Sequence, residues 1–338
     1  MKTLVLALVL VASILVAGCG PGTGFLIRPV PADEALKETT VSTDPGPWVI
    51  DKVAVIDVSG LLFNARGEGL FGPHDNPVSL FVEKIDKAEK DPQVKAVVLR
   101  INSPGGGVTA SDIMYRRLLE MKKERKVPVV AAIEDVGASG AYYIACSSDA
   151  IVAAPTAVTG SIGVIVQTFS LTGTMAKLGI DTKAITSGPM KDMASPFKPL
   201  SPEDQKVLQQ MVTEFYGRFV DVVAAGRPKL ARDAVTKLAD GRIYTGEQAL
   251  AAGLVDATGD VKEAVAEAKK RAGLKAVKTV MYDRPWGYKA NVYSAAPVGG
   301  MQINLLNVSV PGLMTWLEPQ FLYLWTGGAG GAGGAANP

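Results

Sequence analysis

The stretch VPVVAAIEDVGASGAYYIAC, residues 127–146, contains both kinds of segment from which the fold is built. Residues 127–135 form a short apolar run with β-strand character, and the run AYYIA after Gly140 has the character of a buried helix. Gly137 and Ala138 supply small residues for a turn between the two. The stretch therefore predicts a strand that leads into a helix, with Ser139 at the junction.

The same alternation of strand and helix patterns continues along the chain. Apolar runs rich in valine, isoleucine and alanine are usually covered on both faces of a sheet, so we expect an α/β fold with parallel pairing. We expect the later helices to form a helical arm. The predicted strands are 53–60, 95–102, 127–135, 150–155 and 183–188, and the predicted helices are 78–90, 110–126, 201–225, 245–253 and 261–272.

Length and composition limit the class of protein. The 338 residues are 48% hydrophobic, which allows one large or two medium domains with a substantial core. Lysine and arginine exceed aspartate and glutamate by only two charges, so the chain has no basic field for a nucleic acid. We therefore expect no nucleic-acid partner.

The beginning of the chain has the pattern of an export signal. Lys2 precedes an apolar run, residues 4–17, that is too short to span a bilayer. The run ends in VAGC, which resembles the lipobox of bacterial lipoproteins and implies lipidation of Cys19; an ordinary secretory signal is the alternative. We expect a signal peptide at 1–18, a tether at 19–48, and an extracytoplasmic, membrane-anchored protein on the periplasmic side of a diderm cell.

Two further features lie outside the predicted α/β pattern. The segment 274–326 contains an apolar, aromatic stretch that prolines interrupt, so we expect it to pack on the body or on an oligomer rather than to span a membrane. Residues 327–338 have the composition of a flexible Gly/Ala tail.

Cys146 follows a buried-helix pattern, so we expect neither a disulfide nor a thiol nucleophile there.

Two segments carry residues suited to acyl transfer. The sequence NSPGGGV, residues 102–108, leaves main-chain N–H groups uncovered, which suits an oxyanion hole but also a plain strand-to-helix turn. Ser139 would lie at a helix start with the Gly140 N–H beside it, as a nucleophile or as a packing residue. Ala141 stands where the G-x-S-x-G motif has its second glycine, so that motif is absent.

A nucleophilic serine needs a base. The single histidine, His74, lies in a loop pattern typical of the surface, so a lysine is the expected base. A lysine base requires a pKa lowered from about 10.4 to roughly 7–8. Lys191 lies in a loop with apolar neighbours and is a candidate; Lys198 is its rival, and Asp192 would raise the pKa of a nearby amine.

Four motifs in order resemble the SppA-type serine-lysine signal peptide peptidases of the Clp peptidase/crotonase superfamily. They are NSPGGGV, DVGASGAYYIA, TGSIGVI and SGPMKDMASPFKPLSPED; the later GRIYTGEQALAAGLVD fits too. The resemblance covers 49–273 and implies a repeated ββα spiral. It also implies roles for five residues: Ser139 as nucleophile, Lys191 as base, Ser161 as the residue that positions the lysine, and Gly106 and Gly140 as oxyanion donors.

The resemblance further implies a homo-oligomeric ring in which neighbouring subunits supply the serine and the lysine. We expect a membrane-anchored endopeptidase that degrades hydrophobic peptides such as cleaved signal peptides, without a cofactor or metal. The family commonly has an N-terminal membrane helix where this sequence has a lipobox, so the anchoring differs. Two alternatives remain: a crotonase-like acyl-CoA enzyme, which export disfavours, and an inactive scaffold at the membrane.

Overall fold

A mixed sheet of eleven strands organises the part of the chain described by this computed structural model, residues 35–65, 67–69, 72–284 and 321–325. The strands of this sheet are β1 (Lys37–Thr43), β2 (Lys52–Leu62), β5 (Val94–Gly107), β6 (Val129–Ala138), β7 (Ala150–Ala153), β8 (Val158–Gly160), β9 (Ile165–Val166), β10 (Ile243–Thr245), β11 (Ala257–Thr258), β12 (Lys278–Asp283) and β13 (Phe321–Leu324). A separate hairpin pairs β3 (Gly67–Gly69) with β4 (Gly72–His74). The helices are α2 (Pro77–Lys90), α3 (Val108–Arg125), α4 (Gly140–Ala145), α5 (Thr172–Lys177), α6 (Pro202–Gly226), α7 (Arg232–Leu238), α8 (Gly246–Ala251) and α9 (Val261–Arg271).

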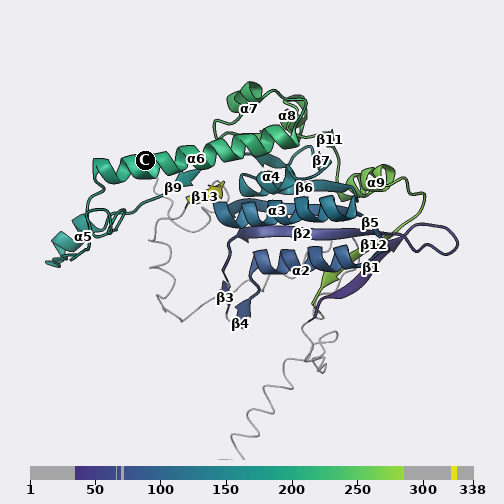
Figure 1. The fold of residues 1–338 in the computed structure, drawn as a ribbon, viewed down its shortest axis with the longest axis horizontal. Helices are drawn as coiled ribbons and strands as arrows, with labels where there is room; N and C mark the ends of the chain where they lie inside the picture. Colours follow the sequence, from purple (N-terminus) through teal and green to yellow (C-terminus); the bar gives the residue numbers. More distant parts are fainter. Residues whose placement is uncertain (1–34, 66, 70–71, 285–320, 326–338) are drawn as a thin grey trace, which may run out of the picture. The chain divides into compact units, whose positions relative to one another are not determined.

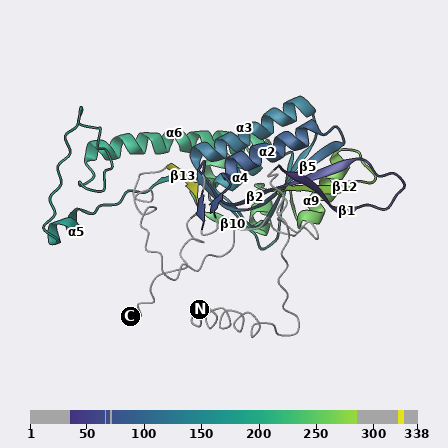
Figure 2. The same cartoon turned by 90° about the horizontal axis from the view of Figure 1, so that it is seen from below.

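The centre of the sheet is parallel, as the sequence predicts. The strands β2, β5, β6 and β7 pair in parallel in that order. Alternate residues of each strand enter different cores: Ala54 and Ile56 pack with α2, α3 and α4, whereas Val53 and Val55 pack with α9. Helices therefore cover both faces of the sheet (Figures 1 and 2), which explains why the strand sequences are apolar without alternation.

The predicted helix starts are confirmed by their caps. The Ser201 hydroxyl accepts the Asp204 N–H at 3.0 Å, and Pro202 occupies the first turn of α6. At α8, Thr245 and Gln248 form a reciprocal capping box. These local interactions fix where α6 and α8 begin.

The structure differs from the sequence prediction at 183–188 and at the triple glycine. Residues 183–188 are exposed coil, with Ile185 95% exposed, and the predicted strand is wrong because no described strand pairs with it. The strand predicted to end at residue 102 continues through the glycines, so β5 ends at Gly107. The Ser103 hydroxyl donates to the Gly60 carbonyl, and pairing with β2 resumes at Gly105 after an irregularity, which keeps the segment extended.

The sheet also extends beyond the range 49–273. Residues 37–43, expected within a tether, instead form β1 and pair antiparallel with β12. The strand β12 in turn pairs in parallel with β2, so both segments belong to the body. The expected signal peptide, Cys19 and the Gly/Ala tail lie outside the described residues. Within the described ranges, no helix combines the length and hydropathy needed to cross a bilayer.

Candidate active site

Ser139 lies where β6 passes into α4, as the sequence predicts, and its backbone is strained. Its φ of 55° and ψ of −117° lie outside the regions that side-chain-bearing residues prefer. The Ser139 N–H donates to the Gly160 carbonyl at 2.7 Å, and its carbonyl accepts the Tyr143 N–H at 2.9 Å. A strained serine on a strand-to-helix turn is typical of a nucleophile, although Ala141 breaks the sequence motif for such a turn.

The strain predicts an unusual order of stability among Ser139 variants. Glycine adopts positive φ without steric cost, whereas alanine does not. We therefore expect Ser139→Gly to have a free energy of unfolding higher by about 1 kcal/mol than that of Ser139→Ala. Denaturant unfolding of the two proteins measures the difference. A less stable Ser139→Gly protein would show that the turn stores no strain.

Two main-chain nitrogens lie close together next to Ser139. The Gly106 nitrogen lies 3.2 Å from where a Cβ on Gly140 would stand, and the Gly140 nitrogen lies 2.6 Å from the equivalent point on Gly105. A side chain at Gly106 would come within 2.2 Å of the Leu62 carbonyl oxygen, so only glycine fits the close approach of β2 and β5. Two main-chain nitrogens next to a candidate nucleophile are the arrangement that an oxyanion hole requires.

Ser161 also lies near Ser139. It follows directly after Gly160, whose carbonyl holds the Ser139 N–H. Like Ser139, Ser161 has a positive φ, 50°, and its N–H donates to the Arg242 carbonyl at 2.8 Å. The strand β8 therefore brings the second candidate serine to the same end of β6.

The two candidate lysines lie elsewhere, in the connection 178–201 between α5 and α6. Figures 1 and 2 show this connection at the end of α6 away from the sheet. The Lys191 side chain is exposed, and the main-chain N–H of Lys191 donates to the Gly188 carbonyl. Lys198 forms ion pairs with Asp192 at 2.6 Å and Asp204 at 3.3 Å. Its hydrogen bond with Asp192 raises the pKa of Lys198, which is the wrong direction for a base.

Two other residues from the sequence analysis have simpler roles. Cys146 is buried beside α4, and burial raises the pKa of its thiol to about 12, which suits the predicted unreactive cysteine. The backbone of His74 belongs to the small hairpin, and its side chain lies outside the described residues.

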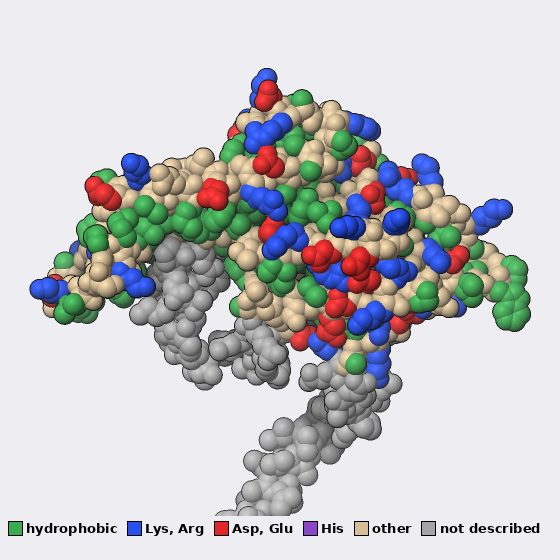
Figure 3. All heavy atoms as spheres, viewed as in Figure 1, with side chains coloured by type: hydrophobic (Ala, Val, Ile, Leu, Met, Phe, Trp, Pro, Cys, Tyr) green, Lys and Arg blue, Asp and Glu red, His purple; other side chains and the backbone are tan. Residues whose placement is uncertain are grey.

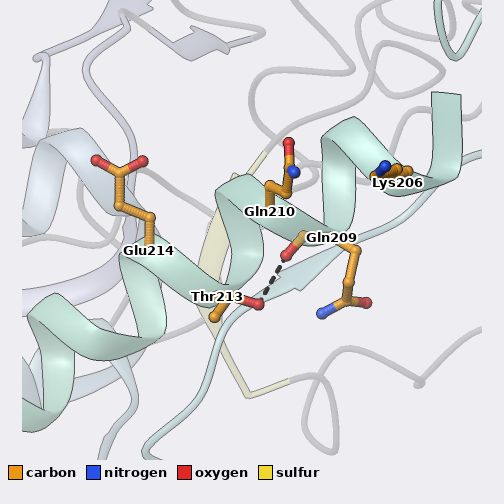
Figure 4. Close-up of a pocket in the computed structure, with 5 residues that line it drawn as sticks. All are labelled: Lys206, Gln209, Gln210, Thr213 and Glu214. Atoms are coloured by element: carbon orange, nitrogen blue, oxygen red, sulfur yellow. Dashed lines mark hydrogen bonds between the residues drawn. The ribbon is translucent and has the colours of Figure 1, made fainter. Parts of the chain in front are cut away.

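An aromatic cluster next to Ser139 is not apparent from the sequence. Tyr143 of α4 stacks on Tyr323 of β13 with ring centroids 5.2 Å apart, and Phe219 of α6 lies 4.7 Å from the same ring. The short apolar and aromatic run FLYLW, residues 321–325, is typical of a buried strand and is the signal in the sequence for this element. A separate pocket, shown in Figure 4, lies on one face of α6. Its side chains include no nucleophile beside a base. They are Lys206, Gln209, Gln210, Thr213 and Glu214.

Comparisons with known proteins point to proteolysis. The model for Peptidase family S49 matches residues 121–275, a range that includes Ser139, Ser161 and Lys191. A candidate SppA-type signal peptide peptidase of Enterococcus faecium is 38% identical over 231 residues, which are 68% of this chain and 67% of that protein. A candidate protease of Synechocystis is 39% identical over 66% of this chain and 75% of its own length. The chloroplastic serine protease SPPA of Arabidopsis thaliana is 34% identical over 70% of this chain and 35% of its own length.

Proposed function

This chain belongs to peptidase family S49 and is a serine peptidase, and on that premise we propose that Ser139 is its nucleophile and Lys191 its general base. The observation that carries the proposal is the strained Ser139 beside the main-chain nitrogens of Gly106 and Gly140. Nucleophile and oxyanion donors must lie together for acyl transfer, and these three residues do.

In the proposed reaction the Lys191 amine takes the proton of the Ser139 hydroxyl, and the Ser139 oxygen attacks a peptide carbonyl. The Gly106 and Gly140 N–H groups stabilise the negative oxygen of the tetrahedral intermediate. The lysine then protonates the leaving amine, and the peptide bond breaks to leave an acyl-enzyme. Water, deprotonated by the same amine, releases the product acid and regenerates Ser139. Ser161 positions the amine.

The proposed base comes from a neighbouring subunit. The arm, which we define as α5, the connection 178–201 and the first half of α6, exposes apolar side chains that a monomer would leave in water. Figure 3 shows hydrophobic side chains along one side of α6. The exposed apolar side chains of the arm are Leu178, Ile180, Ile185, Met190, Phe197 and Leu200. We propose that this surface packs on another copy of the chain in a homo-oligomeric ring and brings Lys191 to that copy's Ser139.

The proposed location and substrates rest on the N-terminal sequence and on similar proteins, not on the chemistry of the site. We propose that lipid on Cys19 holds the protein at a bacterial membrane on the extracytoplasmic side. There it degrades hydrophobic peptides such as cleaved signal peptides. The pattern at residues 4–19 and the similarity to SppA-type proteins support both statements.

The proposal is tested by labelling the full chain with a fluorophosphonate and mapping the adduct by mass spectrometry. We expect an adduct on Ser139, because only an activated serine displaces fluoride at phosphorus. Hydrolysis of an acyl-CoA thioester without an adduct would instead indicate the crotonase-like alternative. Neither adduct nor hydrolysis in the assembled oligomer would indicate a scaffold.

A further inference from the structure

The pairing between β2 and β5 is interrupted just before the proposed oxyanion donors. The regular register on β5 ends at Asn102 and resumes at Gly105. The interval contains Ser103 and Pro104 of β5 and Gly60 of β2. Gly60 and Gly105 have positive φ, 69° and 97°, and proline has no N–H for the pairing. The main-chain polar groups of this interval therefore need partners outside the regular pairing.

A single buried hydroxyl bonds two of these groups. The Ser103 hydroxyl donates to the Gly60 carbonyl at 2.6 Å and accepts the Gly105 N–H at 3.1 Å. Ser103 is fully buried, so bulk water does not compete for either bond. Ser103 also pairs with Gly137 of β6, two residues before Ser139. The hydroxyl therefore ties the glycine segment to β2 at a point beside the strand that carries the nucleophile.

The bond to Gly105 fixes the start of the segment that carries a proposed donor. The direction of the Gly106 N–H depends on the dihedral angles of Gly105, because the two residues share one planar peptide unit. Glycine has no side chain to restrict those angles, so hydrogen bonds must set them. Pairing with Leu62 holds Gly106, and Ser103 holds Gly105. An oxyanion donor stabilises charge only when its direction is fixed before the reaction begins.

We propose that Ser103 is a positioning residue whose hydroxyl fixes the Gly105 N–H and thereby directs the Gly106 N–H at the oxyanion. Ser103 acts through Gly105 and not on the substrate. The inference rests on the proposed function, because it explains how one of the proposed donors is held. The oxyanion exists only in the tetrahedral intermediate and the transition states beside it, so loss of the hydroxyl lowers kcat and spares substrate binding.

Replacement of Ser103 by alanine in the full chain tests this role. We expect kcat for a fluorogenic peptide to fall about 10- to 100-fold and KM to change by less than about threefold, because a donor is misdirected but not removed. Tyr142→Phe is the matched control. It also removes a fully buried hydroxyl, whose acceptor is the Leu254 carbonyl at 2.7 Å, and its kcat should stay within about threefold of wild type.

Two further Ser103 variants keep the test decisive. Loss of the hydroxyl leaves two buried main-chain groups without this partner, so Ser103→Ala is expected to be less stable than wild type. Ser103→Thr keeps a hydroxyl and should recover kcat to within about fivefold of wild type. If Ser103→Ala does not fold, Ser103→Cys keeps the shape with a weaker donor and acceptor, and its kcat should fall about 3- to 10-fold. A folded Ser103→Cys protein with wild-type kcat, or a folded Ser103→Thr protein as slow as Ser103→Ala, overturns the inference.

Inhibitors distinguish positioning from a general loss of structure. A peptide aldehyde accepts the Ser139 oxygen at its carbonyl carbon while the serine proton passes to Lys191, and the aldehyde oxygen becomes the negative oxygen of a hemiacetal. The matching peptide alcohol has no carbonyl and reports peptide binding alone. Ser103→Ala should weaken inhibition by the aldehyde about 10- to 100-fold and by the alcohol less than about threefold. Equal weakening of both inhibitors would give Ser103 a structural role and overturn the inference.

Failure of the proposed function has a different signature. Full peptide hydrolysis by a folded Ser139→Ala protein would overturn the nucleophile and, with it, this inference. A protein that depends on Ser139, and whose folded Ser103→Ala variant keeps both kcat and aldehyde inhibition, would retain the proposed function and overturn only the positioning role.

Discussion

Ser139→Ala should lower kcat/KM for peptide hydrolysis by roughly 10⁴-fold or more, the loss typical of removing a covalent nucleophile. The hydroxyl is the only part removed, and the main-chain donors at Gly106 and Gly140 remain. The residual rate should therefore reflect binding and oxyanion stabilisation alone. The measurement is steady-state hydrolysis of a fluorogenic hydrophobic peptide, with circular dichroism and sedimentation to show that fold and assembly persist.

Ser147→Ala is the matched control for this substitution. Ser147 lies just beyond α4, and its hydroxyl donates to the Ile144 carbonyl at 2.7 Å. Its loss should change kcat/KM by less than about threefold, because a single local hydrogen bond contributes little. Full activity in a folded Ser139→Ala protein would exclude Ser139 as the nucleophile, whatever else the site contains.

Mixing two inactive variants should restore activity if neighbouring subunits share the dyad. Lys191→Ala should lower kcat/KM by roughly 10³-fold or more, since it too removes one partner of the proton transfer. In a ring assembled from equal amounts of both, about one site in four receives Ser139 from one intact copy and Lys191 from another. We therefore expect about a quarter of wild-type activity after co-refolding or co-expression.

Lys198→Ala separates the two lysines of the arm. Lys198 is already paired with Asp192 and Asp204, so its loss should leave most of the activity, and its mixture with Ser139→Ala should gain nothing beyond the active copies. Mixed rings that stay inactive although both variants are present would place the dyad within one subunit. An active Lys191→Ala protein beside an inactive Lys198→Ala protein would reverse the assignment of the base.

The motifs in the sequence predicted both the family and an α/β fold. The chain belongs to peptidase family S49, and its described residues have the α/β fold with a parallel central sheet that the sequence predicts. The prediction of a strand at 183–188 is wrong because no described strand pairs with the β-branched residues there. Composition alone does not reveal whether a partner strand exists. The sequence predicts that this strand of the glycine segment ends at residue 102, because extended glycine has no side-chain pattern. Pairing with β2 and β13 keeps the triple glycine in the sheet.

The sequence alone determined the local features of this protein: apolar runs that must be covered on both faces, capped helix starts, and a serine between a strand and a helix. These features depend on neighbouring residues, so periodicity and side-chain chemistry predict them. Only the tertiary structure decided the positive φ of Ser139, the exposure of Lys191 on the arm, and the pairing of β13 with the glycines. Each of these depends on contacts between segments far apart in the chain, for which a single sequence carries no local signal.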